Sequence, residues 1–248
     1  MLLSHSKSVN VSTITKSRAS VALFLGILLI ALNLRAPFTA LAPVLTFVQH
    51  DFALSTAAVG ALTSLPLLAF AVFSPLSATL AERFGLERTL FAALVVVAVG
   101  IALRSTGSIW LLFAGTAIIG MGIAQGNVLL PSLIKRDFSQ NVAAVTGAYA
   151  LAMGVGGALG SSVVFPLTQA FGWQIALAAF VALPAVALLI WAPQLKERAN
   201  IAPAQEARKQ VGTIWRSALA WQVTMFMGLN AMIFYIAIGW LPTILIDQ

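Results

Sequence analysis

Seven long apolar runs constrain the fold of this 248-residue chain more than any other feature. A helix needs about 20 mostly apolar residues to cross the hydrocarbon core of a bilayer, which is ~30 Å thick. Seven segments meet this length, and the turn at Gly172 and Trp173 separates two of them within one long uncharged stretch. The runs predict membrane-spanning helices at residues 20 to 47, 55 to 80, 88 to 106, 108 to 131, 142 to 168, 174 to 192 and 218 to 245.

The length and composition of these runs exclude the other ways of spanning a membrane. They are more than twice as long as a barrel strand and lack the polar alternation of barrel strands. Sixty per cent of the residues are hydrophobic and only 8% are charged, which is far from the balance of a soluble domain. We therefore expect an all-α polytopic membrane protein, with the lipid bilayer as its first partner.

Few residues in the predicted spans can perform chemistry. The chain has no cysteine, and His5 and His50 both lie outside the apolar runs. The spans also hold no Asp, Glu or Lys. Because an intramembrane hydrolase needs a nucleophile with a base, or metal ligands, we expect no enzyme activity, no cofactor and no metal site.

The basic residues predict the orientation of the chain, because cytoplasmic loops carry an excess of Lys and Arg. With the N-terminus in the cytoplasm, only Arg104 falls on the opposite side and only Arg35 falls within a span. This asymmetry also accounts for the net charge of +7 without a nucleic-acid partner. The predicted cytoplasmic residues are the other 12 of the 14, namely Lys7, Lys16, Arg18, Arg83, Arg88, Lys135, Arg136, Lys196, Arg198, Arg208, Lys209 and Arg216.

One hydrophilic connection divides the predicted spans into six and one. We expect a cytoplasmic tail at residues 1 to 19, a six-helix bundle at 20 to 192, a cytoplasmic linker at 193 to 217, and the first helix of a second, incomplete bundle at 218 to 248. Six helices, a charged linker and a lone seventh helix are typical of the first half of a two-half protein. The interpretation is a truncated chain or an interrupted gene, and a complete seven-helix protein is the alternative.

The loop after the second span, "SATLAERFGLERTL", resembles the signature between helices two and three of the major facilitator superfamily. The matching positions are Ala78, Glu82, Arg83, Gly85 and Arg88, although the superfamily usually has glycine at the first and aspartate at the second. An acid and nearby arginines can form a network between helices, and the glycine permits a tight turn. We interpret Glu82, Arg83, Gly85 and Arg88 as a conformational latch. The alternative is a generic charged turn.

Arg35 is the residue that most strongly suggests a binding site. It lies about 15 residues into the first span, or roughly 22 Å along a helix, near the middle of the membrane. A buried arginine there costs ~2.5 to 3.5 kcal/mol on insertion scales, and no acid lies in the predicted spans to offset this. We predict that Arg35 binds an anionic or polar substrate, with Asn33 and Thr39 adding hydrogen bonds where Pro37 opens the helix. The rival is an ion pair with a missing half or with lipid.

Other polar residues within the spans are weaker candidates for substrate binding. Gln125 and Asn127 in the fourth span either hydrogen-bond between helices or line the pathway. Tyr149 in the fifth span and Asn230 and Tyr235 in the seventh are further candidates. The glycines of the fourth and fifth spans favour close helix packing.

Three stretches together resemble the cyanate permease and 2-nitroimidazole transporter branch of the superfamily. They are "LNLRAPFTALAPVL" in the first span, "GNVLLPSLIKRDF" after the fourth and "MGLNAMIFYIAIGWLPTIL" in the seventh. The resemblance implies a twelve-helix fold of two bundles in a bacterial inner membrane, with a central site open alternately to each side.

We therefore expect a secondary active transporter for a small anionic or polar solute, cyanate-like or nitroimidazole-like. Import and export are both open, and the partners implied are that solute and the missing C-terminal half. The rival function is a non-transporting membrane scaffold, or an inactive fragment of an interrupted transporter gene.

Overall fold

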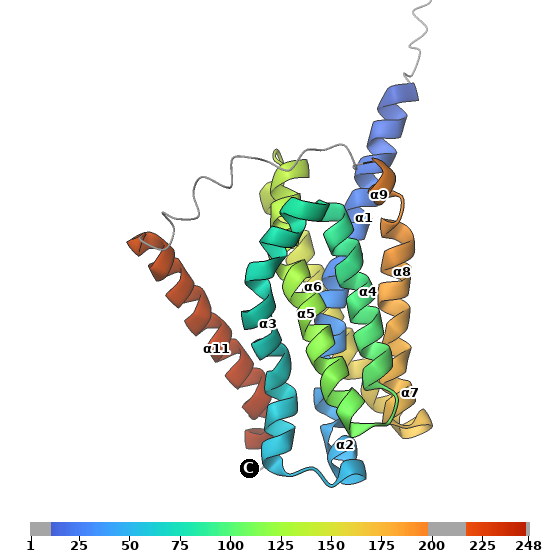
Figure 1. Cartoon of the computed structure of the whole chain (residues 1–248), viewed down its shortest axis with the longest axis vertical. Coiled ribbons are helices and arrows are strands. Elements are labelled where there is room, and N and C mark those ends of the chain that lie inside the picture. Colours follow the sequence, from blue (N-terminus) through green and yellow to red (C-terminus); the bar gives the residue numbers. More distant parts are fainter. Residues whose placement is uncertain (1–10, 198–216, 247–248) are drawn as a thin grey trace, which may run out of the picture. The chain divides into compact units, whose positions relative to one another are not determined.

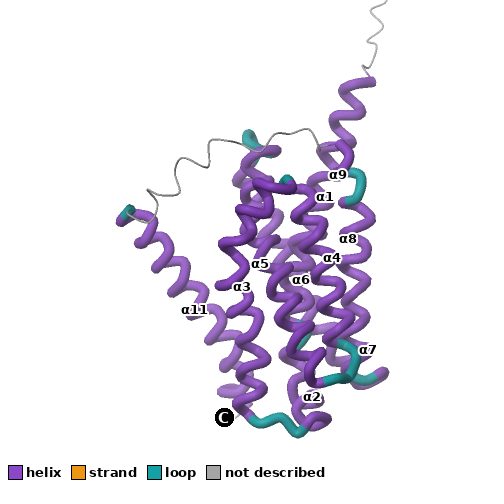
Figure 2. Tube along the Cα trace, in the orientation of Figure 1, coloured by secondary structure: helices purple, strands orange, loops and turns teal. Residues whose placement is uncertain are grey.

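A computed structural model of the chain describes residues 11–197 and 217–246, and their side chains at 21–195 and 217–233. Within these ranges every regular element is a helix, and short loops and turns join the helices (Figures 1 and 2). The chain divides into two compact units, Met1–Ile201 and Ala202–Gln248.

The first unit is a bundle of six segments that are long and apolar enough to cross a membrane. Two of these segments are interrupted: the first by a 3₁₀ turn at Ala42–Val44 and the sixth by one at Ala179–Val181. The predicted all-α fold with a six-helix bundle is confirmed. Its helices are α1 (Val11–Thr39), α2 (Leu45–Phe52), α3 (Thr56–Phe84), α4 (Leu86–Arg104), α5 (Ile109–Asp137), α6 (Val142–Phe171), α7 (Trp173–Ala178), α8 (Ala182–Trp191) and α9 (Gln194–Glu197).

The first span differs from its predicted course at both ends. The α1 helix begins at Val11, inside the predicted tail, where no proline or glycine interrupts the backbone. It ends at Thr39, two residues after Pro37, and the span continues through the 3₁₀ turn and α2 to Phe52 instead of ending at residue 47. Pro37 and Pro43 lack the N–H group that a continuous helix would need, which explains the break between α1 and α2.

Glycine forms two of the tight turns that join neighbouring spans. Gly85 between α3 and α4 has φ 90°, and Gly172 between α6 and α7 has φ 84°. This left-handed region favours glycine because a Cβ would clash there. Each glycine N–H caps the preceding helix, bonding the carbonyls of Ala81 and Thr168 at 2.9 Å. Both glycines were expected at turns from the sequence.

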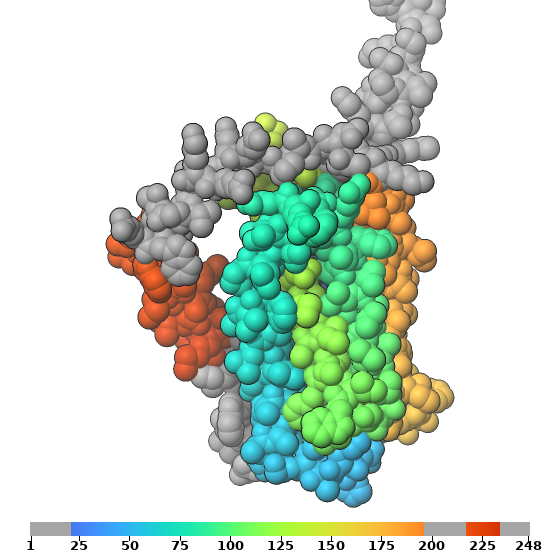
Figure 3. Space-filling view, viewed as in Figure 1, coloured from blue at the N-terminus to red at the C-terminus, as the bar shows by residue number. Residues whose placement is uncertain are grey.

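Other glycines let the helices approach until their backbones touch. A Cβ on Gly100 of α4 would lie 2.9 Å from the carbonyl oxygen of Gly115 of α5. One on Gly156 of α6 would lie 2.6 Å from the carbonyl oxygen of Leu32 of α1. Small residues supply this close packing in membranes, where lipid removes most of the hydrophobic drive between helices. Figure 3 shows α3, α4 and α5 packed side by side on one face of the first unit.

The second unit contains α11 (Ala218–Ile246), which matches the predicted seventh span. Its apolar side chains between Leu219 and Ile233 are exposed.

Candidate functional site

Arg35 lies on the least covered side of α1. Its side chain is half-buried, whereas Asn33, Leu34 and Ala36 around it are buried in the bundle. Helical periodicity places Leu28, two turns earlier, on the same side, and that residue is also half-buried. The cation is therefore within the span but outside the close-packed interior of the first unit.

The neighbour of Arg35 across the bundle is α6. A Cβ on Gly157 of α6 would lie 3.9 Å from the Arg35 Cβ and 3.7 Å from the Thr39 Cγ2. The Thr39 hydroxyl lies 3.0 Å from the Gly157 carbonyl oxygen and 3.1 Å from that of Arg35, so it can donate to either. Thr39 thus fixes the end of α1 against α6 and holds the backbone on which Arg35 is mounted.

Tyr149 of α6 joins Arg35 at this site. It is half-buried against the core, and the Arg35 guanidinium is near enough to act on its phenol electrostatically. Side chains in a helix lean toward the helix N-terminus. The α6 helix runs parallel to α1, since Gly156 lies against Leu32 and Gly160 against Ala36, so Arg35 leans toward the earlier part of α6, which carries Tyr149. The structure therefore brings three of the predicted substrate-binding residues together: Arg35, Thr39 and Tyr149.

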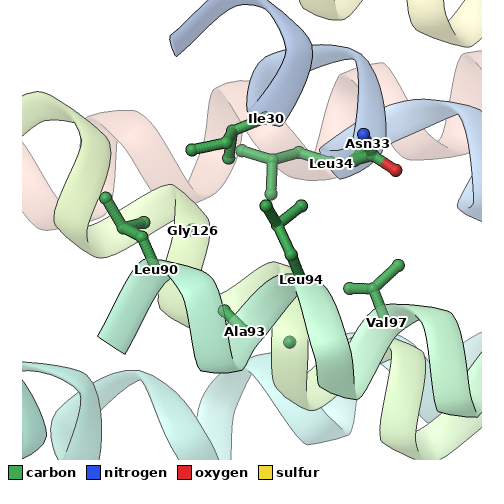
Figure 4. A pocket seen from close by; sticks show the side chains of 9 residues that line it. Ile30, Asn33, Leu34, Leu90, Ala93, Leu94, Val97 and Gly126 are labelled. Atoms are coloured by element: carbon green, nitrogen blue, oxygen red, sulfur yellow. The ribbon is translucent and has the colours of Figure 1, made fainter. Parts of the chain in front are cut away.

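Asn33 lies on a different side of α1 from Arg35. Two residues correspond to about 200° around a helix, and Asn33 is only 1% exposed. Its Nδ2 donates to the Leu29 carbonyl at 2.8 Å, and its buried Oδ1 has no hydrogen-bond partner among the described residues. It lines a cavity of about 10 Å³ whose other lining residues, from α1, α4 and α5, are apolar (Figure 4).

Gln125 and Asn127 of α5 also face different sides, because they too are two residues apart. Asn127 lies two turns after Gly120, where a Cβ would be 2.8 Å from Pro66 and Ala69 of α3. Asn127 is therefore on the α3 side. Gln125 is on the other side and is buried, so of the two it is the one that can face α1 and α6.

Asn230 and Tyr235 belong to the second unit. Asn230 is exposed on α11, and the Tyr235 side chain lies outside the described residues. Their role in binding stays a prediction.

Comparison with known proteins assigns this chain to a family. The profile described as "Major Facilitator Superfamily" matches residues 23–248. The chain belongs to the Major Facilitator Superfamily. It is 52% identical over 238 residues to the 2-nitroimidazole transporter of Escherichia coli (strain K12), covering 96% of this chain and 61% of that protein. It is 27% identical over 227 residues to the cyanate transport protein CynX of the same organism, covering 91% and 59%.

A third relative is the uncharacterized transporter YycB of Bacillus subtilis (strain 168). The two are 45% identical over 234 residues, covering 93% of this chain and 57% of that protein. The chain thus spans about three-fifths of the length of these relatives. The predicted resemblance to the 2-nitroimidazole and cyanate branch is confirmed.

Solved structures agree on the superfamily fold. A bacterial homologue of the human drug peptide transporters PepT1 and PepT2 superposes with a TM-score of 0.65 at 16% identity, over 90% of this chain and 53% of that one. The peptide transporter POT in complex with sulfate gives 0.62 at 16% identity, over 88% and 46%. These likenesses concern the fold alone. With six apolar spans, the superfamily chain is a multi-pass membrane protein.

The superfamily signature loop lies at the end of the bundle where α3 meets α4. Gly85 makes the turn, and Glu82, Arg83 and Arg88 around it are exposed. The Arg83 guanidinium lies 5.3 Å from the centre of the Phe84 ring. Their role as a latch stays a prediction.

The ion pairs of the described residues at this end involve other residues. Arg136 of α5 pairs with Glu87 of α4 and, at 3.0 Å, with Asp137. Glu87 is 5% exposed, and its carbonyl accepts a hydrogen bond from the Trp191 Nε1 at 3.0 Å. Glu87 is not among the residues that the sequence motif predicts to be functional. Its place in the first turn of α4, where an acid stabilises the helix dipole, was the available signal.

Arg104 is more deeply buried than its predicted place on the outer side suggests. It is 1% exposed at the end of α4, so a second cation besides Arg35 lies in a span, and the side of the membrane on which it lies stays a prediction. Its Nη1 donates to the Pro37 carbonyl oxygen at 2.8 Å. The approach is possible because Gly115 of α5 lies directly against the Arg104 backbone. Hydropathy alone does not distinguish a buried cation at the end of a span from a solvated one in a loop.

Proposed function

We propose that the full product of this gene is a secondary active transporter that moves a small anionic or polar solute by alternating access. Membership of the Major Facilitator Superfamily and the named transporters among the relatives support this proposal. The observation that carries the choice of solute is a half-buried arginine within the first span, on the side of α1 that faces α6, the helix that carries Tyr149.

The chemistry of this pair suits a solute whose oxygen atoms carry negative charge. A guanidinium stays charged at every physiological pH and offers a planar fork of N–H donors. A phenol can donate or accept one further hydrogen bond. The nitro group of a 2-nitroimidazole and the cyanate ion both present such oxygens, so the proposed solute is cyanate-like or nitroimidazole-like. Gln125 is the next residue that we place at the site.

The site needs to open to each side of the membrane in turn. We place the protein in the inner membrane with its N-terminus in the cytoplasm, because most of the basic residues fall in segments on one side. The proposal extends to a second bundle facing the first, since alternating access requires two bodies that rock against each other. Glu82, Arg83 and Arg88, around the Gly85 turn, would hold the cytoplasmic side closed.

Uptake by purified protein tests this function. The full gene product is reconstituted in liposomes, and accumulation of labelled cyanate and of a labelled 2-nitroimidazole is followed with an imposed proton or sodium gradient. We expect saturable accumulation or expulsion of at least one solute, and none in protein-free liposomes. A protein that binds to neither solute and moves neither under any gradient would instead be a membrane scaffold.

A further inference from the structure

Arg104 is a buried cation with most of its hydrogen-bonding capacity unused. Its Nη1 donates to the Pro37 carbonyl, while its buried Nε and Nη2 have no hydrogen-bond partner among the described residues. None of the salt bridges of the described part of the chain includes Arg104. Such a group is a poor choice for stability alone, because a permanent charge is expensive to bury and one neutral carbonyl compensates it only in part.

The carbonyl that Arg104 holds is one that the break in the first span has released. In a continuous helix the Pro37 carbonyl would accept from the N–H of Leu41. Here the Leu41 N–H donates to Phe38 instead, at 3.4 Å, and α1 ends at Thr39. The Arg104 guanidinium supplies the donor that the helix no longer provides. It therefore stabilises the broken form of the span.

The same short segment carries Arg35. Pro37 is two residues after Arg35, and Thr39, two residues further on, is tied to the Gly157 carbonyl at 3.0 Å. One end of α1 is thus held from two sides, by Arg104 of α4 and by Gly157 of α6. Two tethers from different helices restrict both the position and the rotation of the segment, and so the direction in which Arg35 leaves the helix.

We propose that Arg104 is a positioning residue that holds the end of α1 so that Arg35 faces the solute. The inference rests on the proposed function, because it assumes that Arg35 binds the transported solute. Arg104 acts through the Pro37 carbonyl and does not itself touch the solute. Its unused N–H groups allow it to take a second carbonyl when the segment shifts during transport.

Three variants of the full gene product test this role. Arg104→Met keeps the length of the side chain and removes every donor, and Arg104→Lys keeps the charge and one donor to Pro37. Thr116→Val is the matched control, since Thr116 is equally buried but bonds only within its own helix, to Leu112 at 2.7 Å. Each variant is measured for expression, thermal stability, and KM and kcat of uptake.

A second readout reports the position of the segment without transport. Residues 1–248 contain no cysteine, so Ala42→Cys introduces the one thiol of this part of the chain, at an exposed position just after the break, and any cysteine elsewhere in the full gene product is first replaced by serine. We expect Arg104→Met to change its labelling rate severalfold and to raise KM about tenfold with a smaller effect on kcat, since small misplacements of binding groups weaken binding strongly. Arg104→Lys should restore most of both values, and Thr116→Val should change neither.

The outcomes separate this proposal from the function on which it rests. An unchanged labelling rate and KM in Arg104→Met, with only a lower thermal stability, would make Arg104 purely structural and overturn the inference. If Arg104→Met fails to fold, Arg104→Gln, which is shorter and uncharged and keeps a polar group, decides by the same two values: a shifted labelling rate and KM support the inference, and wild-type values overturn it. If Arg35→Ala has the wild-type KM, the proposed function fails, whatever the labelling rate shows.

Discussion

Two arginines of the first unit, one partly buried and one fully buried, are stabilised in different ways. Arg136 at the α3–α4 end of the bundle pairs with Glu87 and Asp137, so its charge is balanced by carboxylates. Arg104 instead donates to the Pro37 carbonyl, next to the break of the first span. Asp51 of α2, an acid at the same end of the bundle, accepts a hydrogen bond from the Trp173 Nε1 at 2.6 Å. The first arrangement locks two helices together. In the second arrangement, the stability of the Arg104 cation depends on where the Pro37 carbonyl lies. Such a dependence suits a segment that moves.

The largest expected effect comes from separating α4 and α5 beside Arg104. A Cβ on Gly115 would lie 2.5 Å from the Arg104 backbone nitrogen, and backbone cannot move aside as a side chain can. Gly115→Val should therefore lower the free energy of unfolding by about 3 kcal/mol or more. Thermal unfolding in detergent measures this, with Gly147→Val as control, because nothing lies within 4 Å of a Cβ there. Equal stability of the two variants would contradict the packing described.

The next effect tests the paired arginine. Glu87→Ala leaves the partly buried Arg136 with Asp137 alone, and we expect a loss of about 1–3 kcal/mol in unfolding free energy, below the value for a fully buried pair because Arg136 is partly exposed. Glu82 is exposed, so Glu82→Ala should change the unfolding free energy by less than about 0.5 kcal/mol. Glu87→Gln, which keeps an acceptor for the Arg136 guanidinium without the charge, should lose less than Glu87→Ala. A larger effect at Glu82 would instead favour the predicted latch as the stabilising network.

A smaller effect is expected at the opposite end of the bundle. Trp173→Phe keeps the packing of the ring against Phe52, whose centre is 5.8 Å away, and removes the bond to Asp51. Because the Asp51 side chain is about half exposed, we expect a loss of about 1 kcal/mol in unfolding free energy. Asp51→Asn, which keeps an acceptor, should lose less. Thermal unfolding compares the two, and a larger loss in Asp51→Asn would show that Asp51 acts mainly through its charge.

The smallest effect concerns the second tether of the end of α1, the Thr39 hydroxyl that contacts Gly157 of α6. Thr39→Val removes the hydroxyl near Gly157 and keeps the shape of the side chain. Interhelical hydrogen bonds in membranes contribute about 0.6 kcal/mol on average, so stability should fall by about this amount. The KM for uptake should rise although the loss of unfolding free energy is small, because Thr39 helps to orient Arg35. An unchanged KM would leave Arg104 as the sole tether that matters for binding.

Much of this fold could be predicted from the sequence, because span length, turn glycines and hydropathy are local properties. The break of the first span was foreshadowed by Pro37 and Pro43. The separation of Asn33 from Arg35 was also readable, since two residues on a helix face nearly opposite sides. Arg35 and Thr39, four residues apart, share a face for the same reason.

The partners of the charged residues could not be predicted in the same way. Glu82 and Glu87 stand on either side of the Gly85 turn, and the sequence motif drew attention to the first, whereas the second is buried against α5 and α8. Which acid is buried depends on how helices distant in sequence pack. Arg104 was missed for the same reason, because only the contact with α1 and the close approach of Gly115 make it an interior residue.

Uptake kinetics of Arg35 variants test the central claim most directly. The KM and kcat of the full gene product are measured for wild type, Arg35→Lys and Arg35→Ala at equal expression, with Lys135→Ala, an exposed cation of α5, as the control. We predict that Arg35→Ala raises KM about 10- to 100-fold, as expected for loss of a hydrogen bond to a charged group. Arg35→Lys should fall between, because lysine keeps the charge without the fork. Wild-type KM in both variants would show that Arg35 does not bind the solute.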